Sequence, residues 1–301
     1  AASDVYKRQI CIFLGDWHHH RSALNVDTMD HSLRNLEKVA AAFEHTYFIL
    51  GNHDLYYKEN RSVNSVVYGR NIPNLTLINE PLQKGNVVIT PWLVGEEHRK
   101  LKQMKCKYMF GHFELPNFFM NAMVEMPDTG ELKGSDFKNQ EYVFSGHFHK
   151  RQIHSKIHYL GNAFPHNYAD AGDDERGVMI LEWGGQTQYI AWPDAPKYRR
   201  YMLSDVLEKT DSLLKPNMYC RVELDIDISY EEANFIKETL MPEFKMRELS
   251  LIPRTDVEEH TQQFEGEVNF ESVDSIVTSH LTQLDSPQYD KSLMLDIYRN
   301  L

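Results

Sequence analysis

Residues 49–54 read Ile-Leu-Gly-Asn-His-Asp, and residues 144–149 read Phe-Ser-Gly-His-Phe-His. In both stretches an apolar run ends at or next to a glycine, and side chains that bind metals follow. Two further stretches have the same form, Gly15-Asp16-Trp17-His18-His19-His20 and Gly111-His112-Phe113-Glu114. Glycine lets the backbone turn sharply and approach an ion closely. The four clusters together indicate both the fold and the chemistry of the chain.

The apolar runs before these clusters have the length and composition of short buried strands. They cover residues 10–14, 47–50, 108–110 and 142–145, with a further run at 87–90. Residues 30–44 have helical spacing, and Thr28 or Asp30 is the expected cap. The face of this expected helix is Leu33, Leu36, Val39, Ala40 and Phe43. Strands that alternate with helices predict an α/β fold in which polar loops at strand ends carry the chemistry.

The part of the chain after residue 177 has a different organisation. Residues 178–182 and 188–192 predict a hairpin around Gly184-Gly185, and residues 193–196 are a plausible boundary. We therefore expect a catalytic domain at 10–195 and a small α+β accessory domain, for DNA binding or capping, at 196–257. The accessory domain contains a strand at 219–227 and a helix at 230–240. Residues 258–301 are expected to form a linker and helices at 273–284 and 291–301, whose apolar faces close a small core or bind a partner.

Composition limits the class of protein. The 301 residues carry a net charge of −12, and 42% of them are hydrophobic, an ordinary globular balance. No apolar run approaches the length of a membrane helix. Three distant cysteines favour a reducing compartment, so the cytoplasm is expected, that of a bacterial host if the chain is phage-encoded.

The acidic balance, taken alone, argues against a nucleic-acid partner. The distribution of charged residues along the chain removes that objection. Residues 1–200 contain 23 basic and 23 acidic side chains, whereas residues 201–301 contain 9 and 21. The acidic excess lies outside the expected catalytic domain and points to contact with a protein partner.

Carboxylate, amide oxygen and imidazole together suit borderline divalent ions such as Mn²⁺, Fe²⁺ or Zn²⁺. A single Gly-Asp or Gly-His is more often a turn, but four such clusters after apolar runs are hard to obtain by chance. Five other histidines have no comparable context and are expected to be structural or solvated: His20, His31, His45, His154 and His158.

The order GD, GNHD, GH and GHFH resembles the calcineurin-like metallophosphoesterase superfamily over roughly residues 10 to 192. The resemblance implies a four-layer sandwich of two packed sheets flanked by helices, with two metal ions at the strand ends. Residues 111–115, 145–149, 159–162 and 173–177 are similar to bacteriophage recombination endonuclease subunits of the SbcD-type repair branch. Such nucleases work with an SMC-like ABC ATPase.

One feature departs from that family. Its pattern opens with Asp-x-His on a first strand and continues with Gly-Asp after the second, but here one Gly-Asp cluster precedes Gly51. The interval from Gly15 to Gly51 has room for one helix and one strand, which favours Asp16 as the residue of the second motif. Residues 1–9 are then expected to be a non-native leader, with a first strand and first motif absent. A natural leader is the alternative.

The resemblance assigns a role to each matching residue. Asp16 bridges two ions, and Asn52, His112 and His147 complete one site. His149 belongs to the other site. His53 acts on the leaving oxygen, with Asp54 orienting it. His19 is an auxiliary contact, and His18 is a ligand only if Asp16-Trp17-His18 is itself the first motif. The residues expected to contact DNA are Lys150, Arg151, Arg199 and Arg200.

The resulting hypothesis is a DNA nuclease that hydrolyses phosphodiesters with two divalent ions. Manganese is the expected metal, with iron, zinc or magnesium as alternatives, and one ion is expected to bind more tightly than the other. The partners would be DNA, an SMC-like ATPase bound through the C-terminal helices, and a second copy of the chain in a homodimer. Two alternatives stay open: a phosphoesterase acting on phosphomonoesters or cyclic nucleotides, and a non-catalytic scaffold for the ATPase.

Overall fold

The computed structural model describes residues 9–121, 124–128, 132–253 and 293–295. The chain divides into two compact units, 1–254 and 255–301. The expected helices at 273–284 and 291–301 lie outside the described residues, except that residues 293–295 are helical. No helix among the described residues is long and apolar enough to cross a membrane.

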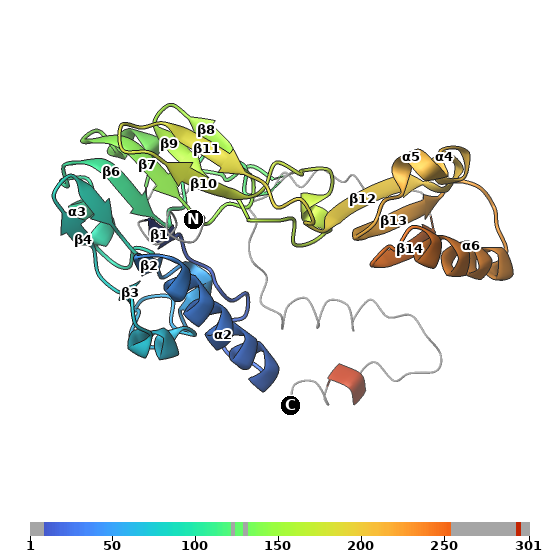
Figure 1. Cartoon of the computed structure of the whole chain (residues 1–301), viewed down its shortest axis with the longest axis horizontal. Helices are drawn as coiled ribbons and strands as arrows, with labels where there is room; N and C mark the ends of the chain where they lie inside the picture. Colours follow the sequence, from blue (N-terminus) through green and yellow to red (C-terminus); the bar gives the residue numbers. More distant parts are fainter. Residues whose placement is uncertain (1–8, 122–123, 129–131, 254–292, 296–301) are drawn as a thin grey trace. The chain divides into compact units, whose positions relative to one another are not determined.

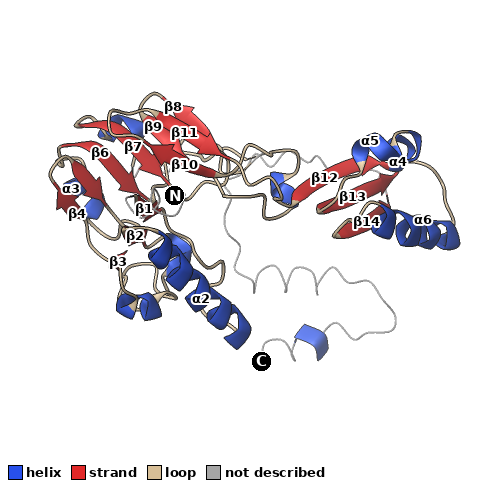
Figure 2. Cartoon of the chain, viewed as in Figure 1, coloured by secondary structure: helices blue, strands red, loops and turns tan. Residues whose placement is uncertain are grey.

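The first unit is a mixed α/β structure with several sheets (Figures 1 and 2). A three-stranded parallel sheet has the order β1-β2-β3, and a six-stranded mixed sheet has the order β4-β5-β6-β7-β9-β8. The strands are β1 (Ile10–Phe13), β2 (His45–Ile49), β3 (Leu75–Ile78), β4 (Leu82–Lys84), β5 (Val87–Ile89), β6 (Cys106–Gly111), β7 (Gln140–Ser145), β8 (Gln152–His154) and β9 (Ile157–Tyr159).

Short helices and turns connect these strands. They are α2 (Val26–Ala42), α3 (Glu97–Leu101) and the 3₁₀ turns η1 (Asn52–Asp54), η2 (Val67–Asn71), η3 (Gly134–Asp136) and η4 (Tyr168–Asp170). The expected hairpin is confirmed as β10 (Val178–Leu181) paired antiparallel with β11 (Thr187–Ile190).

Alternating side chains join the β1-β2-β3 sheet to the six-stranded sheet. Tyr47 and Ile49 of β2 enter one hydrophobic cluster together with Phe110 of β6 and Phe144 of β7. Their neighbours along the strands point the other way, as a strand period of two requires. Phe48 packs in the cluster that includes Leu36 of α2. The sheets therefore share a core and carry helices outside it, an arrangement compatible with the expected sandwich.

Helix α2 begins earlier than the apolar spacing predicted. Its cap is Asn25, whose side chain accepts the Thr28 N–H at 2.7 Å, rather than Thr28 or Asp30. Its buried face also differs, because Leu33 is exposed and Ser32 is buried. Ser32 is polar but accepts the Trp17 indole N–H at 3.2 Å, so its burial carries no unpaired hydroxyl.

The segment after the hairpin forms a parallel three-stranded sheet, β12-β13-β14, around its own core. Helices follow its first two strands, so this is an α/β unit and not the α+β arrangement expected. The β12 strand was not predicted either. The elements are β12 (Lys197–Met202), α4 (Leu203–Glu208), α5 (Thr210–Leu213), β13 (Met218–Leu224), α6 (Tyr230–Glu243) and β14 (Glu248–Pro253).

Candidate metal centre

The four predicted clusters follow the carboxyl ends of parallel strands. Asp16 comes after β1 and Asn52 after its neighbour β2, whereas His112 comes after β6 and His147 after its neighbour β7. Residues that follow adjacent parallel strands meet at one edge of a sheet. Since the two sheets share a core, the two edges supply one site.

Three of the predicted ligands converge closely. Asp16, His112 and His147 each offer a ligand atom, and these atoms all lie within 4.8 Å of one another. His112 Nε2 is 3.1 Å from Asp16 Oδ2, and His147 Nδ1 is 3.2 Å from His112 Nε2. Asn52 joins them, because its Oδ1 lies 3.1 Å from both ring nitrogens. Two imidazoles, a carboxylate and an amide oxygen form a donor set suited to a borderline divalent ion.

The other nitrogen of each histidine is held by an acceptor. His112 Nδ1 donates to the Leu14 carbonyl at 2.6 Å, and His147 Nε2 donates to Glu114 Oε2 at 3.0 Å. Since a carbonyl and a carboxylate only accept, these two nitrogens carry the proton when each ring is neutral. In the neutral rings, His112 Nε2 and His147 Nδ1 offer their lone pairs to a shared ion. Such outer contacts orient metal-binding histidines in proteins.

Electrostatics favours the ionised form of Asp16. Burial opposes its charge, but His112 beside it and the His53 N–H at 2.8 Å hold the pKa of Asp16 well below its usual range. Burial also opposes charge on His112, yet the nearby Asp16 carboxylate raises the pKa of His112 overall. For His147, burial lowers the pKa. Because a carboxylate and a neutral imidazole are the forms that bind a metal, an ion here would replace the proton that Asp16 favours on His112.

Glycine makes the close approach possible at two positions. Gly15 has φ +95°, and a Cβ there would lie 2.6 Å from His112 Nδ1. A Cβ on Gly51 would lie 2.2 Å from Asp16 Oδ1. Asp16 and His147 themselves adopt positive φ, 60° and 84°. Backbone strain of this kind gathers at functional sites when surrounding contacts hold it in place.

Asp54 holds the loop that carries Asp16. Its side chain is fully buried, and it accepts the N–H groups of Asp16, Trp17 and Gly51, each at 2.9 Å. Burial and the Asp16 carboxylate raise the pKa of Asp54 to about 6. We predicted that Asp54 orients His53. Its described contacts are instead with backbone groups of the metal loop.

The remaining predicted histidines lie around the triad. His53 Nδ1 contacts the His19 carbonyl at 2.8 Å, and the two rings stack with centroids 5.3 Å apart. His149 is not in the triad. Its ring centroid lies 6.0 Å from that of His166, and burial lowers its pKa.

His18 lies away from the ligand group. Its Nε2 is 2.7 Å from Ser32 Oγ, and its Nδ1 is 2.8 Å from Ser65 Oγ. Both nitrogens therefore have hydroxyl partners, which fits the interpretation in which His18 is not a ligand. The Ser32 contact fixes the loop after Asp16 against α2, and the Ser65 contact joins it to the segment after η1.

The basic residues predicted to contact DNA have varied surroundings. Arg151 stacks on Tyr189 at 4.1 Å with its Nε and Nη2 buried, and Lys150 lies over the Phe119 ring at 4.6 Å. Arg199 pairs with Asp174 through its two terminal nitrogens, Nη1 and Nη2, whereas Arg200 is exposed. Arg151 is thus partly buried, whereas Arg200 is accessible.

Two residues of the site escaped the sequence analysis. Glu114 belongs to a quoted cluster, but its role depends on where His147 lies, 33 residues away. Trp92 forms a wall, with its ring 5.9 Å from His112 and 5.3 Å from His147. Only the position of Glu114 after Gly-His could have suggested a role. Nothing local marks Trp92.

The fold and site together define a mixed α/β protein with a candidate metal centre at its sheet edges. The chain is similar to exonuclease subunit 1 of Enterobacteria phage T4, with 24% identity over 235 residues. The similar region covers 74% of this chain and 68% of that protein. No protein-family model matches the chain.

Proposed function

We propose that this chain is a metal-dependent DNA nuclease subunit that hydrolyses phosphodiester bonds. The observation that carries the proposal is the convergence of Asp16, Asn52, His112 and His147, with both histidines oriented by acceptors. The similarity to a phage exonuclease subunit supports nucleic acid as the substrate and the phosphodiester bond as its target.

The ligand residues hold the metal and the phosphate. A divalent ion in this donor set would supply an activated water and neutralise charge on the phosphoryl oxygens. Asp16 contributes the charge of the set, and its carboxylate is fixed by the His53 N–H at 2.8 Å. Asn52 adds a neutral oxygen between the two imidazoles.

His53 is the proposed proton donor to the leaving oxygen. It lies beside the triad, because its own N–H contacts Asp16, and it lies outside the ligand group. The stacked His19 ring and the His19 carbonyl orient it. A positioned histidine of this kind contributes about 10²–10⁴-fold to a rate.

The finer proposals concern the second ion and the partners. His149 would serve a second, weaker metal position of a two-metal site in a metallophosphoesterase sandwich. Manganese is the proposed metal. The subunit would work with an SMC-like ATPase that binds the C-terminal region, and it would dimerise with a second copy. The acidic balance of residues 201–301 supports a protein partner there.

The test is cleavage of supercoiled and linear DNA with Mn²⁺ and with Mg²⁺. We expect Mn²⁺-dependent cleavage that is abolished by His147→Ala and reduced about 10²-fold or more by His53→Ala. His31→Ala, on the exposed face of α2, is the matched control and should cleave normally. Hydrolysis of nitrophenyl phosphate without cleavage of DNA would contradict the proposal and favour a phosphomonoesterase. Binding of an ATPase without either activity would indicate a scaffold.

A further inference from the structure

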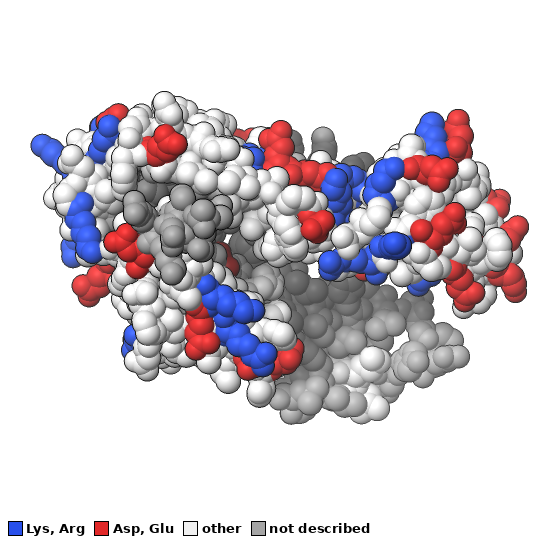
Figure 3. Space-filling model, viewed as in Figure 1, with Lys and Arg blue, Asp and Glu red and all other residues white. Residues whose placement is uncertain are grey.

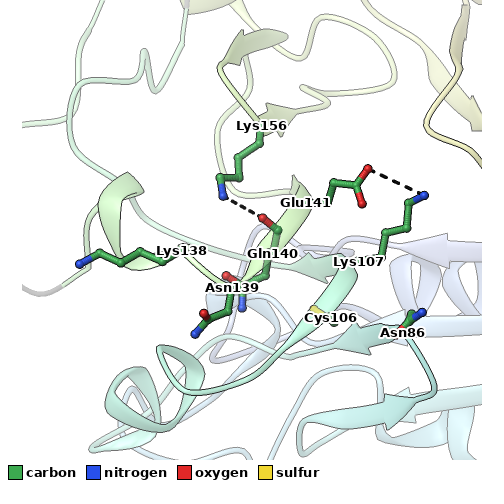
Figure 4. A pocket seen from close by; sticks show the side chains of 8 residues that line it. All are labelled: Asn86, Cys106, Lys107, Lys138, Asn139, Gln140, Glu141 and Lys156. Atoms are coloured by element: carbon green, nitrogen blue, oxygen red, sulfur yellow. Dashed lines mark hydrogen bonds and ion pairs between the residues drawn. The ribbon is translucent and has the colours of Figure 1, made fainter.

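A hollow of about 660 Å³ lies where β6 and β7 begin (Figure 4). Its wall includes Cys106 and Gln140, the first residues of these two strands. Two of the candidate metal ligands, His112 and His147, follow the opposite ends of the same strands. Since β6 has 6 residues, a rise of about 3.3 Å per residue puts the hollow roughly 20 Å from His112. It is therefore separate from the candidate metal centre.

Three lysines give the hollow a positive charge. Lys107, Lys138 and Lys156 line it together with one acidic residue, Glu141. Lys107 Nζ is 3.8 Å from that carboxylate, and Lys156 Nζ donates to the Gln140 carbonyl at 2.8 Å. Lys138 is exposed and makes no ion pair within the described part of the chain. Figure 3 shows basic side chains, with acidic ones among them, at the end of the unit that carries α3, β4 and β6.

The three amino groups do not converge. In Figure 4 they point in different directions around the rim of the hollow. A single phosphate would require donors aimed at one point, as in a nest or a bidentate clamp. Cations spread along a rim suit a ligand that carries several separated negative charges.

An exposed indole adjoins these lysines. A second hollow, of about 400 Å³, shares Asn86 and Lys107 with the first and adds Tyr108 and Trp183. The Trp183 side chain is 66% exposed, and its ring centroid is 4.8 Å from that of Tyr108. The next residue, Gly184, donates its N–H to Tyr108 Oη at 2.8 Å, which holds the hairpin turn against the sheet. The indole is thus backed by protein on one side and open on the other.

We propose that Lys107, Lys138, Lys156 and Trp183 form a binding surface for single-stranded DNA, distinct from the site of cleavage. A groove of cations beside an exposed aromatic ring is the usual means of binding a single strand without sequence preference. The lysines contact successive phosphates and a base stacks on Trp183. An acidic peptide would use the lysines but would leave the indole without a stacking partner. The choice of DNA among nucleic acids rests on the proposed function.

The test measures binding without catalysis. Fluorescence anisotropy of a labelled oligothymidylate is followed in EDTA, on the full chain with His147→Ala, at several salt concentrations. Each lysine–phosphate contact with a single strand adds about 0.7 to the slope of log K against log salt. Replacing Lys107, Lys138 and Lys156 by Gln should therefore lower the slope by about 2. Trp183→Ala should weaken binding about tenfold or more with the slope unchanged.

The matched control variants lose lysines and an aromatic ring at other places in the chain. Lys38, Lys215 and Lys237 are exposed lysines elsewhere in the chain, and their joint change to Gln should leave the slope unaltered. Phe235→Ala removes an aromatic ring that is 70% exposed on α6, and affinity should persist.

Several results would overturn the proposal. One is an unchanged salt slope in the lysine variant, and another is unchanged affinity in Trp183→Ala. Displacement of the oligonucleotide by polyglutamate to the same extent in wild type and Trp183→Ala would indicate a surface for an acidic protein instead. Because binding is measured without metal, the binding result can be interpreted even if the chain does not cleave DNA.

Discussion

Glu114 Oε2 lies 3.0 Å from Nε2 of His147, so a carboxylate two residues beyond one metal ligand determines which nitrogen of another faces the ion. The hydrogen bond from His147 lowers the pKa of Glu114, despite partial burial, and keeps the carboxylate ionised as an acceptor. The two ligand loops after β6 and β7 are thus coupled by a contact that involves no metal.

Removing this acceptor should weaken metal binding. We expect Glu114→Ala to lower Mn²⁺ affinity about 10–100-fold, because the His147 ring loses its fixed tautomer and orientation. Isothermal titration calorimetry measures the change. Glu114→Gln keeps an acceptor oxygen without the charge, so its loss should be smaller. Equal affinities for wild type and Glu114→Ala would show that the contact has no influence on the site.

Asp54 should matter for both stability and metal binding. Asp54→Ala removes the buried acceptor of three N–H groups, those of Asp16, Trp17 and Gly51. Since a buried unpaired polar group costs about 1–3 kcal/mol, the free energy of unfolding should fall by about 3 kcal/mol or more. Urea denaturation measures this loss, and Mn²⁺ titration of the folded variant measures the displacement of Asp16. Asp225→Ala removes the exposed acceptor of the Ser204 N–H in the first turn of α4. This change should lower the free energy of unfolding by about 1 kcal/mol. A comparable loss in the two variants would contradict the role of Asp54.

Glu97 provides a stability change that depends on pH. Arg61 donates to both oxygens of Glu97 and to the Trp92 carbonyl at 2.7 Å, so this pair supports the wall of the site. Burial alone would raise the pKa of Glu97, but the Arg61 contacts lower it overall. A group whose pKa is depressed by folding stabilises the protein above its unfolded pKa, and that contribution disappears as the pH falls through the folded pKa.

Glu97→Gln should therefore lower stability by about 1 kcal/mol at pH 7 and by progressively less below pH 4.5, the ordinary pKa of Glu. Thermal unfolding followed across pH measures the difference. Glu96→Gln is the control, because its ion pair with Arg99 is exposed and should contribute nothing measurable at any pH. A constant difference between Glu97→Gln and wild type from pH 7 to pH 3 would refute the assignment.

A buried ion pair stabilises the loop near His149. Arg176 and Asp170 are 2% and 0% exposed, with Nη2 and Oδ1 3.0 Å apart, and Asp170 also accepts the His166 N–H. Arg176→Met should cost about 3–5 kcal/mol, because it leaves an uncompensated buried charge. The double variant Arg176→Met with Asp170→Leu should recover part of this loss in urea denaturation. A double variant less stable than the single one would exclude that explanation.

Three of the candidate ligands could be proposed from the sequence because their signal is local. Asp16, His112 and His147 each lie within two residues of a glycine at the end of an apolar run, and parallel strands bring such ends together. The hydrogen-bond acceptors that orient the two histidines are not marked by any local sequence pattern. Glu114 acts on a histidine 33 residues away, and the acceptor for His112 is a backbone carbonyl, which no side chain reveals.

The face of α2 and the β12 strand were also not predicted correctly, because contacts with residues distant in the sequence determine them. Leu33 was expected on the buried face of α2 because it is apolar, but it is exposed. Ser32 is buried in its place because Trp17 and His18 form hydrogen bonds with its hydroxyl group. The β12 strand reads Lys-Tyr-Arg-Arg-Tyr-Met, which looks too charged for a strand. Arg199 is partnered by Asp174, a residue 25 positions earlier, so tertiary contacts overrode the local pattern.

Metal addition should distinguish the tight position from the weaker one. Within the described residues, only Asp16, His112 and His147 bring three such ligand atoms within 4.8 Å, so we expect calorimetry to give one tight Mn²⁺ site. At 100 times its Kd, Mn²⁺ should stabilise the protein by about 2.7 kcal/mol and raise the Tm by several degrees. His112→Ala should remove both the heat and the Tm shift. His149→Ala should leave both largely intact, since His149 lies outside the triad. Two tight sites in wild type, one of them lost in His149→Ala, would instead mean that the second position is as complete as the first.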